Sequence, residues 1–248
     1  METMVPSTSA ALFSLLQADF KTQWRNRRSV VLILLVPVII LISWKGIIDK
    51  MGGAFALSTC ITIGLTAVGL MGYSNAIARD RDKGVFQRLR VTPVPTWSIM
   101  ISRLIVQLAM ILLLTVFIFF VGYDYDGIKL TAPGYALTFL MAFVGGAVYL
   151  GLGQMIVGLV KNAETVNSTT RLVYFVFIMV GMFGDLGVLG KGLKEVIQWS
   201  PYGTVKTILA ASMQPAWNNH TSMALLATLL YAFIFSFLGI KWFRWSSQ

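Results

Sequence analysis

The sequence predicts an all-α integral membrane protein with six transmembrane helices. Of its 248 residues 56% are hydrophobic and only 12% are charged, and the mean hydropathy is +0.75. A hydrocarbon core about 30 Å thick requires roughly 20 helical residues, and residues 104–123 contain no charge over such a length. The apolar runs do not alternate with a period of two, and lipid requires each span to pair its own backbone groups. We therefore expect helices and not strands.

Length places the six spans, and charge orients them. We expect spans at residues 29–44, 54–77, 99–121, 135–160, 172–184 and 223–240. With the N-terminus inside, 13 of the 20 Lys and Arg residues fall in inner segments and six in outer segments, while Arg103 lies just inside the third span. Because inner loops are enriched in Lys and Arg, both termini should be cytoplasmic. Orientation and anionic lipid also explain the net charge of +10 without nucleic acid.

The chain should accordingly have a cytoplasmic N-terminal segment (1–28), one six-span domain (29–241) and a cytoplasmic tail (242–248). The N-terminal segment should form an amphipathic helix in the inner head-group layer, because its apolar residues share an arc of about 120°. These residues are Leu12, Phe13, Leu16, Phe20 and Trp24. The helix could be a lipid anchor or could contact a cytoplasmic partner.

Several chemistries are not expected on this chain. Cys60 is the only thiol and His220 the only imidazole, so one copy cannot form a disulfide or a zinc cluster. The only Gly-Lys pair, at 190–191, lacks the other residues of a phosphate-binding loop, and no paired catalytic groups lie in the spans. We therefore expect no enzyme activity and no catalytic, cofactor-binding or metal-binding residues. An ion-coupled secondary transporter, which typically carries several intramembrane acids, stays an alternative.

The loop at 79–95, between spans two and three, has the most specific pattern. Its first part can form a short helix on which Val85, Phe86 and Leu89 make one apolar edge among basic residues. Such an edge suits insertion into a groove of another protein. Asp80 and Asp82 lie near the start of this helix, where carboxylates are favoured. The alternative is a loop that only sets the orientation of the spans.

The long outer segment at 185–221 reads as a pair of helices separated at Ser200 and Pro201. The first helix mixes apolar and charged residues, so the pair could either re-enter the membrane or lie on its surface. Asp185 precedes it at the outer end of the fifth span. An acidic group at membrane depth indicates a function, whereas a helix-end residue among the head groups would need none.

The loop at 79–95 resembles the signature of ABC exporter permeases of the second type. The shared pattern is acidic-x-acidic-Lys-Gly at 80–84, a Leu-Arg pair at 89–90 and Thr-Pro-x-Pro at 92–95. The resemblance covers nearly the whole chain, since the amphipathic helix, the six spans and the long outer loop are also family features. Asp80 and Gln87 stand where glutamates are common, so particular ion pairs with a partner should differ.

This resemblance implies the permease subunit of an ATP-driven exporter in a bacterial cell membrane. The loop would be a coupling helix that docks on a nucleotide-binding subunit. ATP and Mg²⁺ would then be bound by two partner ATPase subunits, and the substrate path would run between two permease chains, identical or different. A small amphipathic substrate such as a drug, antibiotic, peptide or lipid is favoured, and export of a lipid-linked glycan is the alternative.

Candidate site residues follow in three places. The resemblance implies coupling to the ATPase through Asp80, Asp82, Lys83, Gly84, Val85, Phe86, Leu89 and Arg90. A polar start and an aromatic wall in the fifth span suit an amphipathic substrate, although helix packing would also explain them. The lining candidates are Met71, Asn75, Tyr174, Phe175, Met179 and Phe183. In the family the outer hairpin helps to close the exit, which implies an outer gate at Asp185, Trp199, Pro201 and Tyr202.

Overall fold

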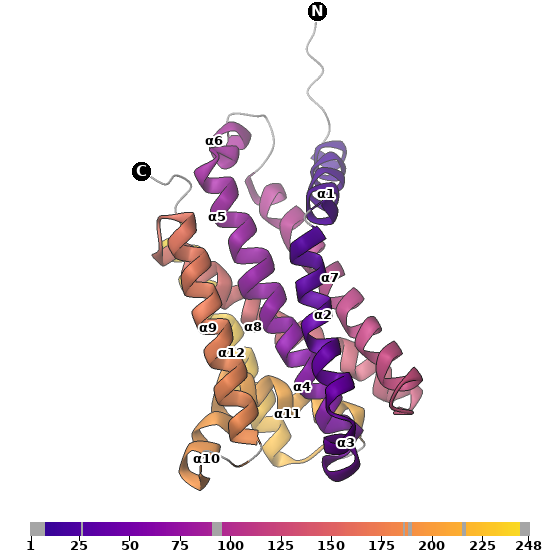
Figure 1. The fold of residues 1–248 in the computed structure, drawn as a ribbon. Coiled ribbons are helices and arrows are strands. Elements are labelled where there is room, and N and C mark those ends of the chain that lie inside the picture. The colour runs from indigo at the N-terminus through magenta and orange to yellow at the C-terminus, as the bar shows by residue number, and fades with distance from the viewer. Residues whose placement is uncertain are drawn as a thin grey trace, which may run out of the picture.

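A computed structural model of the chain is a bundle of helices (Figure 1). It describes residues 8–25, 27–90, 96–185, 187, 190–214 and 217–243. These residues contain helices and no strand, which confirms the all-helical class. The helices are α1 (Thr8–Arg25), α2 (Arg27–Ser43), α3 (Lys45–Met51), α4 (Gly53–Thr66), η1 (Ala67–Tyr73), α5 (Ser74–Asp82), α6 (Val85–Arg90), α7 (Thr96–Asp124), α8 (Ala132–Leu159), α9 (Ala163–Asp185), α10 (Lys191–Trp199), α11 (Pro201–Met213) and α12 (Asn219–Trp242).

Five described helices are long and apolar enough to cross a membrane, whereas the sequence predicted six. The five are Gly53–Asp82, which joins α4, η1 and α5, then Ser98–Asp124 within α7, and the whole of α8, α9 and α12. The helix at the expected first span, α2, has 17 residues and contains Pro37. It falls short because roughly 20 residues are needed to cross a hydrocarbon core. Trp44 alone separates α2 from the short helix α3.

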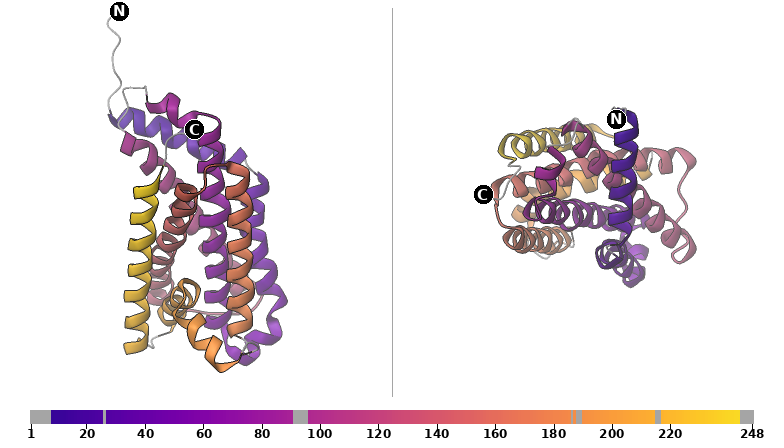
Figure 2. Two further views of the ribbon diagram at one scale, coloured as in Figure 1. Left: turned by 90° about the vertical axis from the view of Figure 1, so that its left-hand side faces the viewer. Right: turned by 90° about the horizontal axis from the view of Figure 1, so that it is seen from above.

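The two ends of the bundle carry different elements (Figure 1 and Figure 2). α1, α6 and the C-terminal end of α12 lie at one end, here called the α6 end. α3, α10 and α11 lie at the opposite end, here called the α11 end. The continuous column α4–η1–α5 is almost completely buried and lies between α2 and α9 in Figure 1, whereas α9 and α12 expose most of their surface.

The column contains a π-helix, η1, where it touches α8. The Ser74 hydroxyl donates to the carbonyl oxygen of Gly69, five residues earlier, at 2.8 Å. A Cβ on Gly69 would lie 2.4 Å from the carbonyl carbon of Tyr149, and one on Gly153 would lie 2.4 Å from Ser74 Oγ. The backbones of the two helices are therefore in contact, and a side chain fits at neither glycine. π-turns within helices are rare and occur frequently at functional sites.

The hairpin that was expected on the outer side, α10 and α11, consists of two unlike helices. Ser200 caps α11 by accepting a hydrogen bond from the Gly203 N–H at 3.2 Å, and Pro201 takes the first helical position, where its missing N–H costs nothing. α11 is largely buried against α4, α8 and α12. α10 instead exposes Val196 and Trp199. α11 is therefore part of the core of the bundle and is not a surface helix.

We expect Gly69→Ala to lower the free energy of unfolding by about 1–3 kcal/mol, because the new methyl group would force two backbones apart. Fluorescence-detected thermal unfolding of the purified protein in detergent would record a lower midpoint. Gly46→Ala is the matched control, because a Cβ at Gly46 in α3 meets nothing within 4 Å. It should leave the midpoint unchanged or raise it slightly. A Gly69→Ala midpoint equal to that of the wild type would contradict the contact between η1 and α8.

Candidate functional site

At the α6 end, Arg81 joins the end of α5 to the end of α8. Its side chain is 2% exposed and donates from Nη1 to the carbonyl oxygen of Val157 at 2.7 Å. Nη2 donates to the carbonyl oxygens of Val160 at 2.7 Å and Lys161 at 2.6 Å. The last carbonyls of a helix have no partner within it and carry partial negative charge. Val157 lies in the last turn of α8, Val160 caps the helix and Lys161 follows it, so the carbonyl oxygens at this helix end both bond the buried guanidinium and partly neutralise it.

Asp82 makes the complementary contact with the start of α9. Its Oδ2 accepts a hydrogen bond from the N–H of Ala163, the first residue of α9, at 3.1 Å. A carboxylate is favoured at this position because the first amides of a helix are unpaired and carry partial positive charge. Arg81 and Asp82 are adjacent in the chain, so one short segment holds both sides of the turn between α8 and α9. We call this pair of contacts the α8–α9 clamp.

α6 follows the clamp after a sharp turn at Gly84, whose φ of +66° suits glycine. Phe86 of α6 is fully buried, with its ring edge-on to Phe243 at a centroid distance of 5.9 Å. The Arg103 guanidinium lies 5.8 Å from the Phe86 ring centroid. Phe86 was expected on an exposed edge that inserts into a partner. Instead it anchors α6 to α7 and to the end of α12, because its own chain already supplies an apolar site.

The other coupling candidates divide by exposure. Asp82 and Lys83 are exposed, Gly84, Val85 and Leu89 are half-buried, and Gln87 and Arg88 add exposed polar groups to the same turn. The surface presented by the α5–α6 turn is therefore charged. The side chain of Arg90 and residues 91–95, with both prolines of the loop, lie outside the described part of the chain.

Asp80 is engaged within the permease by Arg103 of α7. Arg103 Nη1 forms an ion pair with Asp80 Oδ2, and Arg103 Nε lies 3.3 Å from Asp19 Oδ1 of α1. Ser102 Oγ also donates to Asp19 Oδ2 at 2.5 Å. Burial raises the pKa of the Asp19 carboxyl, and the Arg103 charge opposes this rise. This cluster joins α1, α5 and α7, so the Asp80 carboxylate has an ionic partner within the permease itself.

The candidate substrate-path residues do not form one site within a single chain. Met71 and Asn75 are half-buried on the central column, where Asn75 Nδ2 donates to the Met71 carbonyl oxygen at 3.0 Å. Tyr174 and Met179 are half-buried and pack towards the interior. Phe175 and Phe183 are exposed on α9, at 58% and 44%. Thr170 Oγ1 donates to Asn75 Oδ1 at 3.5 Å and connects α9 to the column.

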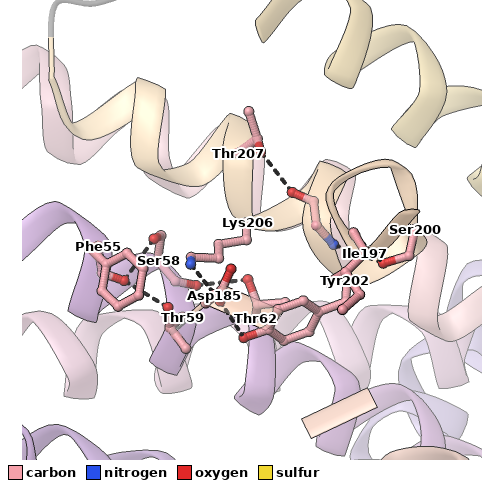
Figure 3. A network of polar contacts seen from close by, with 11 residues as sticks. Phe55, Ser58, Thr59, Thr62, Asp185, Ile197, Ser200, Tyr202, Lys206 and Thr207 are labelled. Carbon is pink, nitrogen blue, oxygen red and sulfur yellow. Dashed lines mark hydrogen bonds and ion pairs between the residues drawn. The ribbon is translucent and has the colours of Figure 1, made fainter. Parts of the chain in front are cut away.

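At the α11 end, Asp185 forms an ion pair that the sequence did not predict (Figure 3). Its Oδ2 lies 2.6 Å from the Nζ of Lys206, a side chain of α11 that is 10% exposed. Tyr202 donates its hydroxyl to the same oxygen at 3.4 Å. The ammonium also lies 3.7 Å from the ring centroid of Phe55 in α4, close enough for a cation–π contact. Asp185, Tyr202, Lys206 and Phe55 are called the outer latch below.

The remaining outer-gate candidates hold the hairpin by other means. Tyr202 is buried against Gly181 of α9, where a Cβ would lie 2.5 Å from its Cε1. Trp199 is partly exposed, and its carbonyl oxygen accepts a hydrogen bond from the Tyr231 hydroxyl at 2.8 Å. Pro201 starts α11, and its carbonyl oxygen accepts from the Tyr149 hydroxyl at 3.4 Å. All four candidates thus lie around α11, but their contacts link it to different helices.

Three largely buried charged residues were not among the site candidates, and each left a signal in the sequence. Lys206 is the single charge in α11, four residues after Tyr202 and hence on the same helix face. Arg81 lies between two acids just beyond an apolar span, and Arg103 lies just inside the next one. Charged residues so close to membrane depth usually pair within the bundle. The positions of these three charges indicated that each has a contact within the bundle, but they did not identify the contacting residue.

Two comparisons with known proteins identify the family of this chain. The family model described as "ABC-2 type transporter" matches residues 10–205 of the chain. The "Putative transport permease YvfS" of Bacillus subtilis (strain 168) is 22% identical over 232 residues, which is 90% of this chain and 92% of that protein. The family match runs from α1 into α11 and includes the α8–α9 clamp and α6, and it ends one residue before Lys206 of the outer latch. The chain therefore belongs to the ABC-2 type transporter family.

Proposed function

We propose that this chain is the permease subunit of an ATP-driven exporter and that the α5–α6 turn couples it to a separate ATPase. Membership of the family makes the chain a membrane component of an ABC transporter, which works with ATPase partners. The α8–α9 clamp supports the coupling proposal most directly. A force applied to the exposed turn at Lys83 acts on the adjacent Arg81 and Asp82. These two residues are hydrogen-bonded to the end of α8 and to the start of α9.

α9 would transmit this force across the membrane. It has 23 residues and is therefore roughly 34 Å long, with the clamp at its start and Asp185 at its end. A displacement at the α6 end would reach the Asp185–Lys206 pair without an intervening loop. We propose that α10 and α11 form the outer gate, that α11 re-enters the membrane, and that the outer latch keeps the gate closed at rest.

The proposed substrate path lies between two permease chains. Met71 and Asn75 are half-buried on the column, which lies between α2 and α9 in Figure 1, and α9 exposes Phe175 and Phe183. We propose that these residues line one face of the path. A second copy placed over this face would enclose an aromatic path suited to a small amphipathic compound. In this arrangement α2 also crosses the membrane, which brings the number of spans to six. The α6 end and both termini are cytoplasmic. Two ATPase subunits bind ATP and Mg²⁺.

Charge reversal of the proposed docking surface should abolish ATPase binding. In Lys83→Glu with Arg88→Glu, two exposed cations become anions, and we expect at least about tenfold less co-purified ATPase subunit because complementary charge is lost. Lys50→Glu, an exposed lysine of α3 at the α11 end, is the matched control and should co-purify normally. Undiminished co-purification of the double variant would rule out docking through this turn.

Loss of the Asp82 acceptor should uncouple ATP hydrolysis from transport while the ATPase stays bound. Asp82→Ala leaves the Ala163 N–H unpaired, which for a helix cap typically costs about 1 kcal/mol. Asp82→Asn keeps a carbonyl oxygen for this bond and is the matched variant. In vesicles with the ATPase and its substrate, we expect severalfold less transport per ATP hydrolysed for Asp82→Ala and near-normal transport for Asp82→Asn. Equal ratios in the two variants would contradict the clamp.

Asp185→Asn should loosen the hairpin, because it leaves the Lys206 ammonium in a site with little solvent and no counter-charge. Removing one partner of a buried ion pair typically costs about 3–5 kcal/mol. Hydrogen–deuterium exchange of residues 191–213 should therefore accelerate more than exchange in α8. Lys194→Met removes an exposed lysine of α10 and should change little. Combining Asp185→Asn with Lys206→Met should slow exchange again, since no unpaired charge remains. Persistently fast exchange in this double variant would contradict the latch.

A further inference from the structure

A polar cavity of about 370 Å³ lies at the α6 end between α1, α5 and α7. Its lining includes the basic residues Arg25, Arg79, Lys83 and Arg103 and the acids Asp19 and Asp80. Arg103 holds both carboxylates, and no described carboxylate forms an ion pair with the other three cations. The lining therefore keeps an excess of positive charge that favours an anion.

Two buried side-chain amides in the lining each have one atom without a hydrogen-bond partner. Gln23 of α1 is 9% exposed, and its Nε2 has no hydrogen-bond acceptor. Gln107 of α7 is 3% exposed, and its Oε1 has no hydrogen-bond donor. Buried polar atoms are almost always paired, so each such atom requires an explanation. Both residues line this one cavity, which would therefore suit a ligand that brings an acceptor and a donor together.

The orientation of α1 places the cavity at the membrane surface. Phe13, Phe20 and Trp24 are exposed on α1, at 70%, 44% and 65%. Asp19 and Gln23, four residues apart on the same helix face, point inward to the cavity. An amphipathic helix with exposed aromatic side chains lies in the head-group layer with those side chains towards the acyl chains. The cavity below α1 is then within reach of a lipid head group.

We propose that this cavity binds the head group of one anionic phospholipid that carries hydroxyl groups, such as phosphatidylglycerol. The phosphate oxygens accept from Gln23 Nε2 and from the cations of the lining, and a head-group hydroxyl donates to Gln107 Oε1. An ethanolamine head group also has a donor but has no net charge to match the lining. An acidic segment of the ATPase would match the charge, but the buried amides favour small groups that enter the cavity.

Lipid titration of the full-length permease, purified without its ATPase, tests this proposal. The probes are dioctanoyl phosphatidylglycerol, dioctanoyl phosphatidylethanolamine and inorganic phosphate, with thermal unfolding and native mass spectrometry as readouts. We expect phosphatidylglycerol to bind and to raise the unfolding midpoint at concentrations about tenfold lower than phosphatidylethanolamine does, because of the charge excess. Inorganic phosphate should have no effect at these concentrations. An equal effect of phosphate would indicate a site for free anions and would overturn the lipid proposal.

Gln107→Leu separates a lipid site from a structural role. It should weaken phosphatidylglycerol binding about tenfold, while the lipid-free midpoint stays equal or rises because an unpaired buried acceptor is removed. Gln198→Leu, at the α11 end, is the matched control and should bind the lipid normally. Unchanged lipid binding by Gln107→Leu would mean general contact with surrounding lipid and would overturn the proposal. Stabilisation by the ATPase subunit alone, with no response to lipid, would identify a protein occupant and would equally overturn it.

Discussion

The buried guanidinium of Arg81 is the contact on which the α6 end depends. A charge removed from water is tolerated only when it is paired or hydrogen-bonded, and here three carbonyl oxygens at the end of α8 meet this need. The planar guanidinium can reach all three from one position, which the single ammonium of a lysine could not do. Arg81 thereby joins α5 to α8 and also supplies hydrogen-bond donors to carbonyl oxygens at the end of α8 that have no partner within the helix. With Asp82 beside it, the exposed turn is hydrogen-bonded to the adjoining ends of two membrane helices.

The ion pairs of the described residues lie at the two ends of the bundle. The interior between them contains hydroxyl groups in place of charged pairs. Buried hydroxyl groups along the column, such as those of Thr62 and Thr66, donate to carbonyl oxygens four residues earlier in their own helix. They are satisfied locally and offer little to a polar solute. Hydroxyl groups that are bonded within their own helix fit the proposed path on the surface of the chain better than a path through its interior. Asn75, half-exposed and bonded to Thr170 of α9, is a polar group on that surface.

Helix positions were largely predictable, whereas side-chain partners were not. Uncharged length located α7, α8, α9 and α12, and Pro201 after Ser200 marked the start of α11. Arg81 meets carbonyl oxygens 76 to 80 residues away, and no local pattern encodes such a distance. Phe86 shows a different limit: an apolar residue in a charged loop predicts burial, but the burying surface can be the same chain or another one. The expected first span, residues 29–44, coincides with α2, but the 17 residues of α2 fall short of the roughly 20 that cross a hydrocarbon core.

The π-helix in the middle of the column has a consequence for how α4 and α5 face their neighbours. A wider turn takes up roughly one residue more than an α-helix does over the same rise, so it rotates everything after it by about 100° relative to a regular helix. A helical wheel drawn straight through residues 53–82 therefore assigns the wrong side to Arg81. Shortening η1 by one residue would make the column regular, yet it would turn the guanidinium away from α8. The irregular turn in the middle of the column thus sets the direction in which Arg81 points towards the end of α8.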